Sequence, residues 1–162
     1  EEFNRRVDAV GSKGTLLSEV TLELIKKCGE WGTGDLVTIR CDKHGGRSRY
    51  GPLLQATFPE YLIEVVREGR EESLYRWGPA NERVDISFVA GGEQFLPAAL
   101  ASMTAKYLRE LAMLAFNQFW TSQLPGLRPT AGYPVDAKRF KAEITTTQRR
   151  LGITDESLWR KR

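Results

Sequence analysis

Glu93 to Glu110 read EQFLPAALASMTAKYLRE, and this part of the sequence says most about the fold. Pro97 stands early in the stretch, and proline is tolerated in the first turn of a helix. The apolar residues continue beyond it as far as Trp120. We therefore expect the longest helix of the protein to run from Pro97 to Trp120 and to form much of its core. Its aromatic residues are expected to pack inside, and they are Phe116, Phe119 and Trp120.

The same helix carries a polar stripe. Ser102, Lys106 and Arg109 are spaced by four and three positions, so they share one helix face. A charged stripe of this kind usually faces solvent. Small residues lie beside the stripe, however, and would allow another element or a ligand to approach closely; they are Ala98, Ala99, Ala101 and Ala105. A phosphate backbone would suit the basic pair formed by Lys106 and Arg109.

Hydrophobic periodicity and turn residues predict alternating helices and strands in the rest of the chain. The expected elements are a helix over 12–28, a buried strand over 36–41, a short helix over 50–58, a strand over 61–66, a hairpin of strands 73–77 and 83–89, and a last helix from about 135. Five prolines and glycines make the segment 124–134 a loop. The expected class is therefore α/β, with a mixed sheet flanked by helices in a single domain over residues 1–162.

Composition narrows the classes of protein. The chain has 41% hydrophobic and 28% charged residues, which is typical of a folded globular domain and unlike a disordered chain. A net charge of +3 permits a polyanionic partner without requiring one. Charged residues interrupt the apolar run 96–120, so no membrane span is expected. Two cysteines and a single histidine disfavour a disulfide framework or a structural zinc site, and we expect a cytoplasmic protein.

Two carboxylates stand at the ends of expected elements. Asp42 follows the strand 36–41 and precedes a polar loop, and ligand sites of α/β folds gather at the carboxyl ends of strands. The alternative is an ordinary turn aspartate, which is the more common case. Glu93 lies just before the long helix, where an acid either favours the helix dipole or coordinates a cation. Asp85 lies on the face of its strand opposite the apolar residues, and we expect it to meet water rather than join an acidic cluster.

Residues 93–110 resemble the signature of the type-2 ribonuclease H family (RNase HII), in which an acid four residues before a proline precedes an Ala-Ser-x-x-Ala-Lys-x-x-Arg-acid helix. Residues 39–42, Ile-Arg-Cys-Asp, resemble the family's strand that ends in a catalytic aspartate. Residues 132–135, Gly-Tyr-Pro-Val, resemble its Gly-Tyr-Gly/Pro-Thr segment. The order of the three motifs agrees, and the resemblance extends loosely from Phe3 to Phe140. It implies the later part of a ribonuclease H-like fold.

The resemblance also implies a function. Asp42 and Glu93 would be two of the four carboxylates that hold Mg²⁺ or Mn²⁺, and the reaction would be two-metal hydrolysis of the RNA strand of an RNA–DNA hybrid. Lys106 and Arg109, with Ser102 on the same helix face, would lie beside the substrate backbone. Tyr133 would lie in a loop near the substrate.

The sequence departs from the family pattern in three places. The family's opening motif, Asp-Glu-x-Gly-Arg-Gly, does not occur; Glu93 replaces an aspartate; and Lys138 stands where the family carries a histidine. Because the sequence opens at Glu1 without an initiator methionine, we expect it to be part of a longer protein, with an N-terminal segment or a second chain completing the fold. The expected activity of this chain alone is low. The alternatives are a non-catalytic nucleic-acid-binding module and a partner-binding domain of similar fold.

Overall fold

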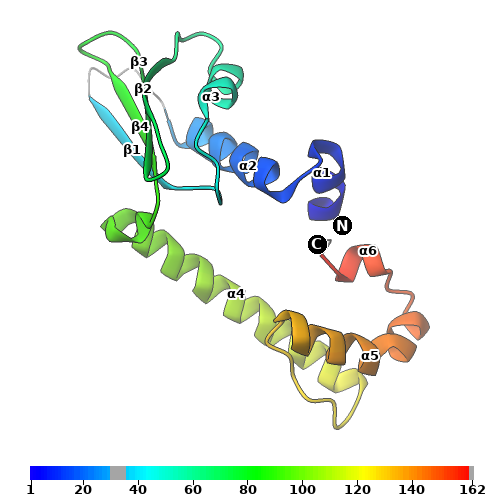
Figure 1. The fold of residues 1–162 in the computed structure, drawn as a ribbon. Coiled ribbons are helices and arrows are strands. Elements are labelled where there is room, and N and C mark those ends of the chain that lie inside the picture. Colours follow the sequence, from blue (N-terminus) through cyan, green and yellow to red (C-terminus); the bar gives the residue numbers. More distant parts are fainter. Residues whose placement is uncertain (30–35, 161–162) are drawn as a thin grey trace. The chain divides into compact units, whose positions relative to one another are not determined.

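The structure is a computed structural model that describes residues 1–29 and 36–160 (Figure 1). The chain divides into two compact units. The sheet unit comprises Arg6–Ala101, and the helical unit comprises Glu1–Arg5 together with the chain from Ser102 onward. Helices α1 (Glu2–Val10) and α4 (Leu96–Gln123) have residues in both units. The single domain expected over the whole chain stays a prediction.

The sheet unit contains a four-stranded mixed sheet with the strand order β1-β4-β3-β2. Strand β1 (Val37–Asp42) runs parallel to β4 (Val84–Val89). Strand β3 (Glu72–Trp77) is antiparallel to both β4 and β2 (Glu64–Glu68). Helices packed on a mixed sheet confirm the expected α/β class.

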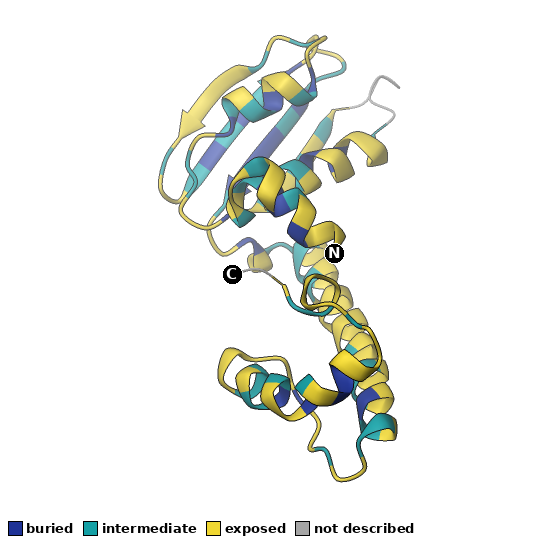
Figure 2. Ribbon diagram, turned by 90° about the vertical axis from the view of Figure 1, so that its right-hand side faces the viewer, coloured by how far each residue is buried: buried dark blue, intermediate teal, exposed yellow. Residues whose placement is uncertain are grey.

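Helices α2 (Lys13–Cys28) and α3 (Gly51–Thr57) bury one face of the sheet. Alternate residues of the inner strands point into this core, as Figure 2 shows by the dark segments of the strands. The ring of Tyr50 stacks flat on that of Phe88, with 3.7 Å between centroids and 1° between planes. Large side chains contributed by helices, strands and loops complete the core; they are Leu22, Ile25, Leu54, Phe58, Tyr75, Trp77, Val84 and Ile86.

Most elements of the sheet unit confirm the sequence-based predictions. The helix over 12–28 is α2, and the Ser12 hydroxyl accepts a hydrogen bond from the Thr15 amide at 3.0 Å, as an N-cap should. The hairpin is β3 and β4, and Gly78 in its turn has φ +88°, with space for no side chain beside the Glu82 carbonyl. The strand expected over 61–66 lies later, at Glu64–Glu68.

Strand β1 corrects one expectation. It was expected to be buried, but its residues alternate between half-buried and exposed. The reason is its position at the edge of the sheet, where β4 is its neighbour and one face carries no helix of the core cluster. Thr38, Arg40 and Asp42 point to that open face.

The helical unit contains most of α4, together with α5 (Pro134–Arg150) and α6 (Asp155–Leu158). Trp120, Phe140 and Ile144 form its buried centre. The N-terminal residues join this unit through Asn4, whose side-chain amide donates to the carbonyls of Glu156 at 3.0 Å and Trp159 at 2.8 Å. Helix α5 confirms the prediction of a helix from about residue 135, although α6 follows it; α1 and α6 were not predicted.

Helix α4 confirms the expected long helix but not the expected core. Trp120 is its only buried residue, and the yellow ribbon of Figure 2 follows most of its length. Phe119, which was expected to pack inside, is 45% exposed. The exposed aliphatic and aromatic side chains of α4 also include Leu96, Leu100, Met103, Tyr107, Leu108, Leu111 and Leu114. The expectation is wrong because helical periodicity identifies an apolar face, but another element must be present to bury it.

Candidate functional site

The two candidate acids lie at the carboxyl end of the parallel strands β1 and β4. Asp42 is the last residue of β1, and the short helix η1 (Gly92–Gln94) follows β4. The Gly92 amide donates a hydrogen bond to Oδ1 of Asp42 at 3.0 Å. Glu93 is the next residue. The fold therefore brings Asp42 against the backbone of the residue that precedes Glu93.

Gly92 allows this close approach. A Cβ atom added there would lie 3.0 Å from Cα and 3.1 Å from Cβ of Asp42. These distances are shorter than most Cβ contacts, so the Asp42 backbone would have to shift by a few tenths of an ångström to admit the new atom. The neighbouring Gly91 has φ +71°, a conformation that favours glycine. The Gly91-Gly92 pair therefore explains how η1 can lie directly on the end of β1.

Replacing Gly92 by alanine is expected to destabilise the sheet unit by about 1–3 kcal/mol, because the new methyl group crowds Asp42. Gly46→Ala is the matched control, since a Cβ at Gly46 meets no atom within 4 Å. The control should change the free energy of unfolding by no more than about 1 kcal/mol. Urea unfolding of both variants measures the difference. Equal stabilities would contradict the close approach of Gly92 to Asp42.

The donor set of this site fits a metal only in part. Both carboxylates are exposed, and their hard oxygen atoms are ligands that Mg²⁺ and Mn²⁺ prefer. However, residues 1–29 and 36–160 contain no group of three or more His, Cys, Asp or Glu side chains able to hold a metal ion. Two carboxylates do not make a two-metal centre. Asp42 and Glu93 could therefore serve such a centre only as part of a larger ligand set.

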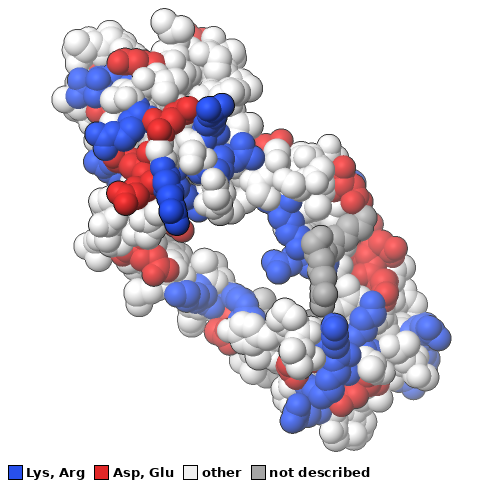
Figure 3. All heavy atoms as spheres, in the orientation of Figure 1, with Lys and Arg blue, Asp and Glu red and all other residues white. Residues whose placement is uncertain are grey.

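Asp85 does not belong to this pair. The strand register places Asp85 beside Thr38, whereas Asp42 lies beside Val89, four residues further along. At the rise of a strand, this separates them by about 13 Å. Asp85 lies on the open face, as expected, but ion pairs hold it there: its Oδ1 is 2.8 Å from Nε of Arg76 and 3.5 Å from Nε of Arg83. Figure 3 shows such acidic and basic side chains interleaved over the sheet unit.

His44, two residues beyond Asp42, is buried between helix α2 and the core. Its Nδ1 lies 2.9 Å from the Ser18 hydroxyl, and its Nε2 lies 3.3 Å from the Thr21 hydroxyl. Its ring also contacts Tyr50 and Phe88 edge-on. Burial lowers the pKa of His44, and the nearby charge of Arg47 lowers that pKa further. These contacts tie the loop that follows Asp42 to α2.

The second group of candidate residues lies in the helical unit. Arg109 of α4 donates a hydrogen bond to the Ala131 carbonyl at 2.6 Å and another to the Glu110 carboxylate at 2.6 Å. Its guanidinium lies 5.7 Å from the ring centroid of Tyr133, a cation–π distance. Lys106 is exposed one turn earlier, and Ser102 is half-buried one turn before that. The fold therefore brings Arg109 and Tyr133 together, with Lys106 on the same helix.

Side chains from α4 and α5 fix the loop that carries Tyr133. Asn117 and Thr130 exchange two hydrogen bonds of 2.9 Å between the Asn117 amide group and the Thr130 backbone. The Asp136 carboxylate accepts from the Thr130 hydroxyl at 2.5 Å and the Ala131 amide at 3.0 Å, and Arg139 donates to it at 2.7 Å. These residues were not predicted from the sequence. The available signal was the acid in the first turn of a helix after Gly-Tyr-Pro.

Acidification should loosen this loop. The hydrogen bond from Thr130, and then those from Arg139 and Ala131, lower the pKa of Asp136 to about 2. In the unfolded chain an aspartate has a pKa of about 3.9, so the stabilisation is complete above that pH and is lost as the pH falls toward 2. Asp136→Asn should flatten the acid side of the stability profile of the helical unit. Glu156→Gln, a change of an exposed carboxylate in the same unit, should not, and equal profiles for the two variants would contradict the role of Asp136.

Comparisons with known proteins do not assign the chain to a class. It matches no protein-family model, and no curated protein or solved structure is significantly similar to it. Among the residues described, no helix combines the length and the apolar character needed to cross a bilayer. The geometry of the two candidate groups therefore carries the functional argument.

Proposed function

We propose that the chain is a cytoplasmic ribonuclease H-like domain, related to type-2 ribonuclease H, that binds RNA–DNA hybrids and supplies two carboxylates to a Mg²⁺- or Mn²⁺-dependent endonuclease site. The contact between Asp42 and Gly92 is the observation that carries this proposal. It supports a shared site for Asp42 and Glu93, the two acids that match the family's catalytic positions. The carboxyl ends of parallel strands are also where α/β folds bind their ligands.

Substrate binding is assigned to the helical unit. Lys106, Arg109 and Tyr133 present two cations and an aromatic ring at its surface, which is the chemistry that contacts phosphates and bases. Ser102 adds a hydroxyl on the same helix face. The Ala131 carbonyl and the Glu110 carboxylate hold the Arg109 guanidinium in place. Binding therefore costs less side-chain entropy at this residue.

An additional element completes the fold in this proposal, either another segment of the protein or a second chain. Two observations support it. Seven exposed aliphatic and aromatic side chains lie along α4 between Leu96 and Leu114, a larger apolar surface than isolated exposed residues provide. Strand β1 has β4 on one side and an open edge on the other within the sheet as described. The additional element would also supply the carboxylates that this chain lacks.

Hybrid binding tests the proposal. In the double variant Lys106→Ala/Arg109→Ala, the slope of log K against log salt should become shallower by about one for each phosphate that the protein no longer neutralises. The affinity for a blunt RNA–DNA hybrid should fall accordingly. The matched control is Arg149→Ala/Arg150→Ala, which removes the same charge from the end of α5. Fluorescence anisotropy at several salt concentrations measures both slopes. An unchanged slope in the Lys106→Ala/Arg109→Ala variant would support the alternative that this helix face only meets solvent.

The second candidate function is a non-catalytic nucleic-acid-binding module. It is favoured because the described residues bring no three His, Cys, Asp or Glu side chains together in a group able to hold a metal ion. It predicts the same salt dependence for hybrid binding. It differs in predicting that no form of the protein cleaves, including forms with additional sequence.

A further inference from the structure

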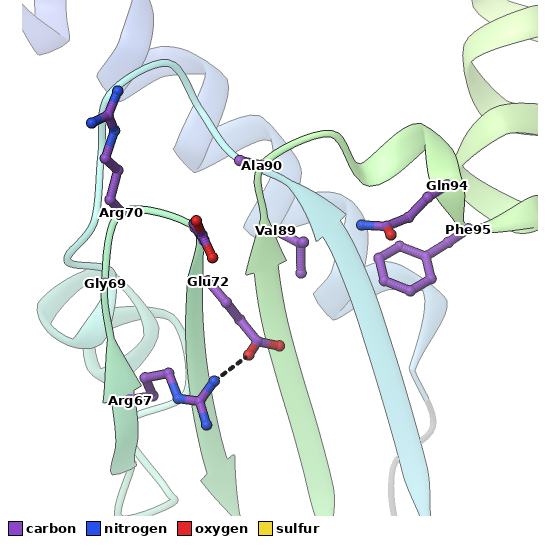
Figure 4. A pocket seen from close by; sticks show the side chains of 9 residues that line it. Arg67, Gly69, Arg70, Glu72, Val89, Ala90, Gln94 and Phe95 are labelled. Atoms are coloured by element: carbon purple, nitrogen blue, oxygen red, sulfur yellow. Dashed lines mark hydrogen bonds and ion pairs between the residues drawn. The ribbon is translucent and has the colours of Figure 1, made fainter.

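A pocket of about 810 Å³ opens on the face of the sheet that α2 and α3 leave uncovered. Its volume falls in the range of small-molecule sites. Figure 4 shows Arg67 and Glu72 paired on one side, Gln94 and Phe95 on the other, and Val89 between them. The pocket lies entirely within the sheet unit. It also adjoins the candidate acids, since Gln94 and Phe95 directly follow Glu93.

Ion pairs organise the charged side of the pocket. The two carboxylate oxygens of Glu72 face different arginines, Arg67 at 3.1 Å and Arg40 at 3.6 Å. Arg40 is held further by a hydrogen bond of 2.8 Å to the Ser87 hydroxyl. A third arginine, Arg70, lines the pocket and has no ion-pair partner among the described residues. Arg40 contacts Glu72 from outside the lining, and the lining itself balances Arg67 and Arg70 against Glu71 and Glu72. Arg70 is therefore the lining cation that an anion could pair with at the least cost.

The opposite side of the pocket offers a ring and an amide. Phe95 is half-buried, and the Arg40 guanidinium lies 5.5 Å from its ring centroid. Gln94 contributes an exposed side chain with both a donor and acceptors. Aromatic faces stack nucleobases, amides read base edges, and arginines bind phosphates. These three chemistries occur together in one nucleotide.

We infer that this pocket binds one unpaired nucleotide, with its base against Phe95 and Gln94 and its phosphate between Arg67 and Arg70. The inference rests on the proposed function, because it places this nucleotide beside the scissile phosphate that the proposed function would bring to Asp42 and Glu93. A hybrid that continues into a single strand would therefore make a contact that a blunt hybrid cannot. The proposed substrate is therefore an RNA–DNA hybrid with a single-stranded extension.

Fluorescence anisotropy with two labelled hybrids of equal duplex length tests the inference, one blunt and one with a short single-stranded tail. One stacked base should strengthen binding of the tailed hybrid by about 5-fold to about 100-fold. Phe95→Leu should remove this advantage and leave the blunt affinity unchanged. Gln94→Ala alters an exposed side chain and should reduce the advantage even if Phe95→Leu misfolds. Arg83→Gln, at the other end of the sheet face near Asp85, should preserve it.

The outcomes separate this inference from the proposed function. Equal binding of tailed and blunt hybrids by the unmodified chain, or an advantage that survives both pocket variants, overturns the pocket and leaves hybrid binding intact. If inorganic phosphate displaces the tail as effectively as a nucleoside monophosphate does, base recognition by the pocket is overturned. Binding of single-stranded oligonucleotides that depends on Phe95, without binding of blunt hybrid, supports the pocket and overturns the proposed function.

Discussion

Residues 1–162, supplied with Mg²⁺ or Mn²⁺ and an RNA–DNA hybrid, should bind the hybrid and show little or no cleavage. The reason is electrostatic. Two divalent ions a few ångströms apart carry four positive charges, and several carboxylates together with the substrate phosphate are needed to offset their repulsion. Asp42 and Glu93 provide two carboxylates. Asp85 cannot provide a third carboxylate, because ion pairs hold it away from Asp42. Four residues of strand separate the two positions, which is about 13 Å at the rise of a strand.

A gel assay of hybrid cleavage measures this result directly. The informative comparison is a form of the protein that also carries an Asp-Glu-x-Gly-Arg-Gly strand, fused or as a separate chain. Cleavage should then rise by orders of magnitude, and Asp42→Asn or Glu93→Gln in that form should abolish it. Glu156→Gln, far from either candidate group in sequence, is the matched control. Efficient cleavage by residues 1–162 alone, abolished by Asp42→Asn, would show that the described carboxylates are sufficient.

Phe88→Ala should unfold the sheet unit or leave it marginally stable. The Phe88 ring is fully buried, stacks on Tyr50 and touches the rings of His44 and Tyr75. Truncation to alanine removes these ring interactions and leaves a cavity, at a cost of about 3–5 kcal/mol. Small domains are stable by only about 5–15 kcal/mol in total.

Urea unfolding monitored by circular dichroism measures this change. The control is Leu62→Ala in the same unit, where the side chain is 89% exposed and the change should stay within about 0.5 kcal/mol. A Phe88→Ala variant as stable as the control would contradict the assignment of this ring to the centre of the core. Loss of the sheet unit would also remove the Asp42 site, so activity data on this variant are not informative.

The elements that the sequence predicts correctly are those with local signals. The cap at Ser12 marks the start of α2, and the glycine at position 78 marks the hairpin turn. The adjacency of Asp42 and Gly92 follows from a general rule, that neighbouring parallel strands end at one edge. The exposed apolar face of α4 could not be predicted, because periodicity does not report whether a covering element is present.

Other features depend on register and tertiary contact, which a single sequence does not encode locally. Asp85 pairs with Arg76 because β3 and β4 align those two residues, and a shift of one position would turn Asp85 to the other face. The pocket brings Arg67 of β2 together with Phe95 after η1, two elements that are distant in sequence. Asn117 braces Thr130 across a loop rich in proline and glycine. None of these pairs has a sequence motif.

The two edges of the sheet differ in how they tolerate growth. Edge strand β2 carries Glu64, Arg67 and Glu68 and has a register irregularity between Val65 and Arg67, and both charge and irregularity discourage a further strand from pairing. Edge strand β1 is regular along its whole pairing with β4. A further strand can therefore pair with the β1 edge, whereas the β2 edge discourages pairing. A fibre forms only if each molecule has two edges that can pair with a neighbour. This sheet has one such edge, so it favours the addition of a single strand over open-ended polymerisation.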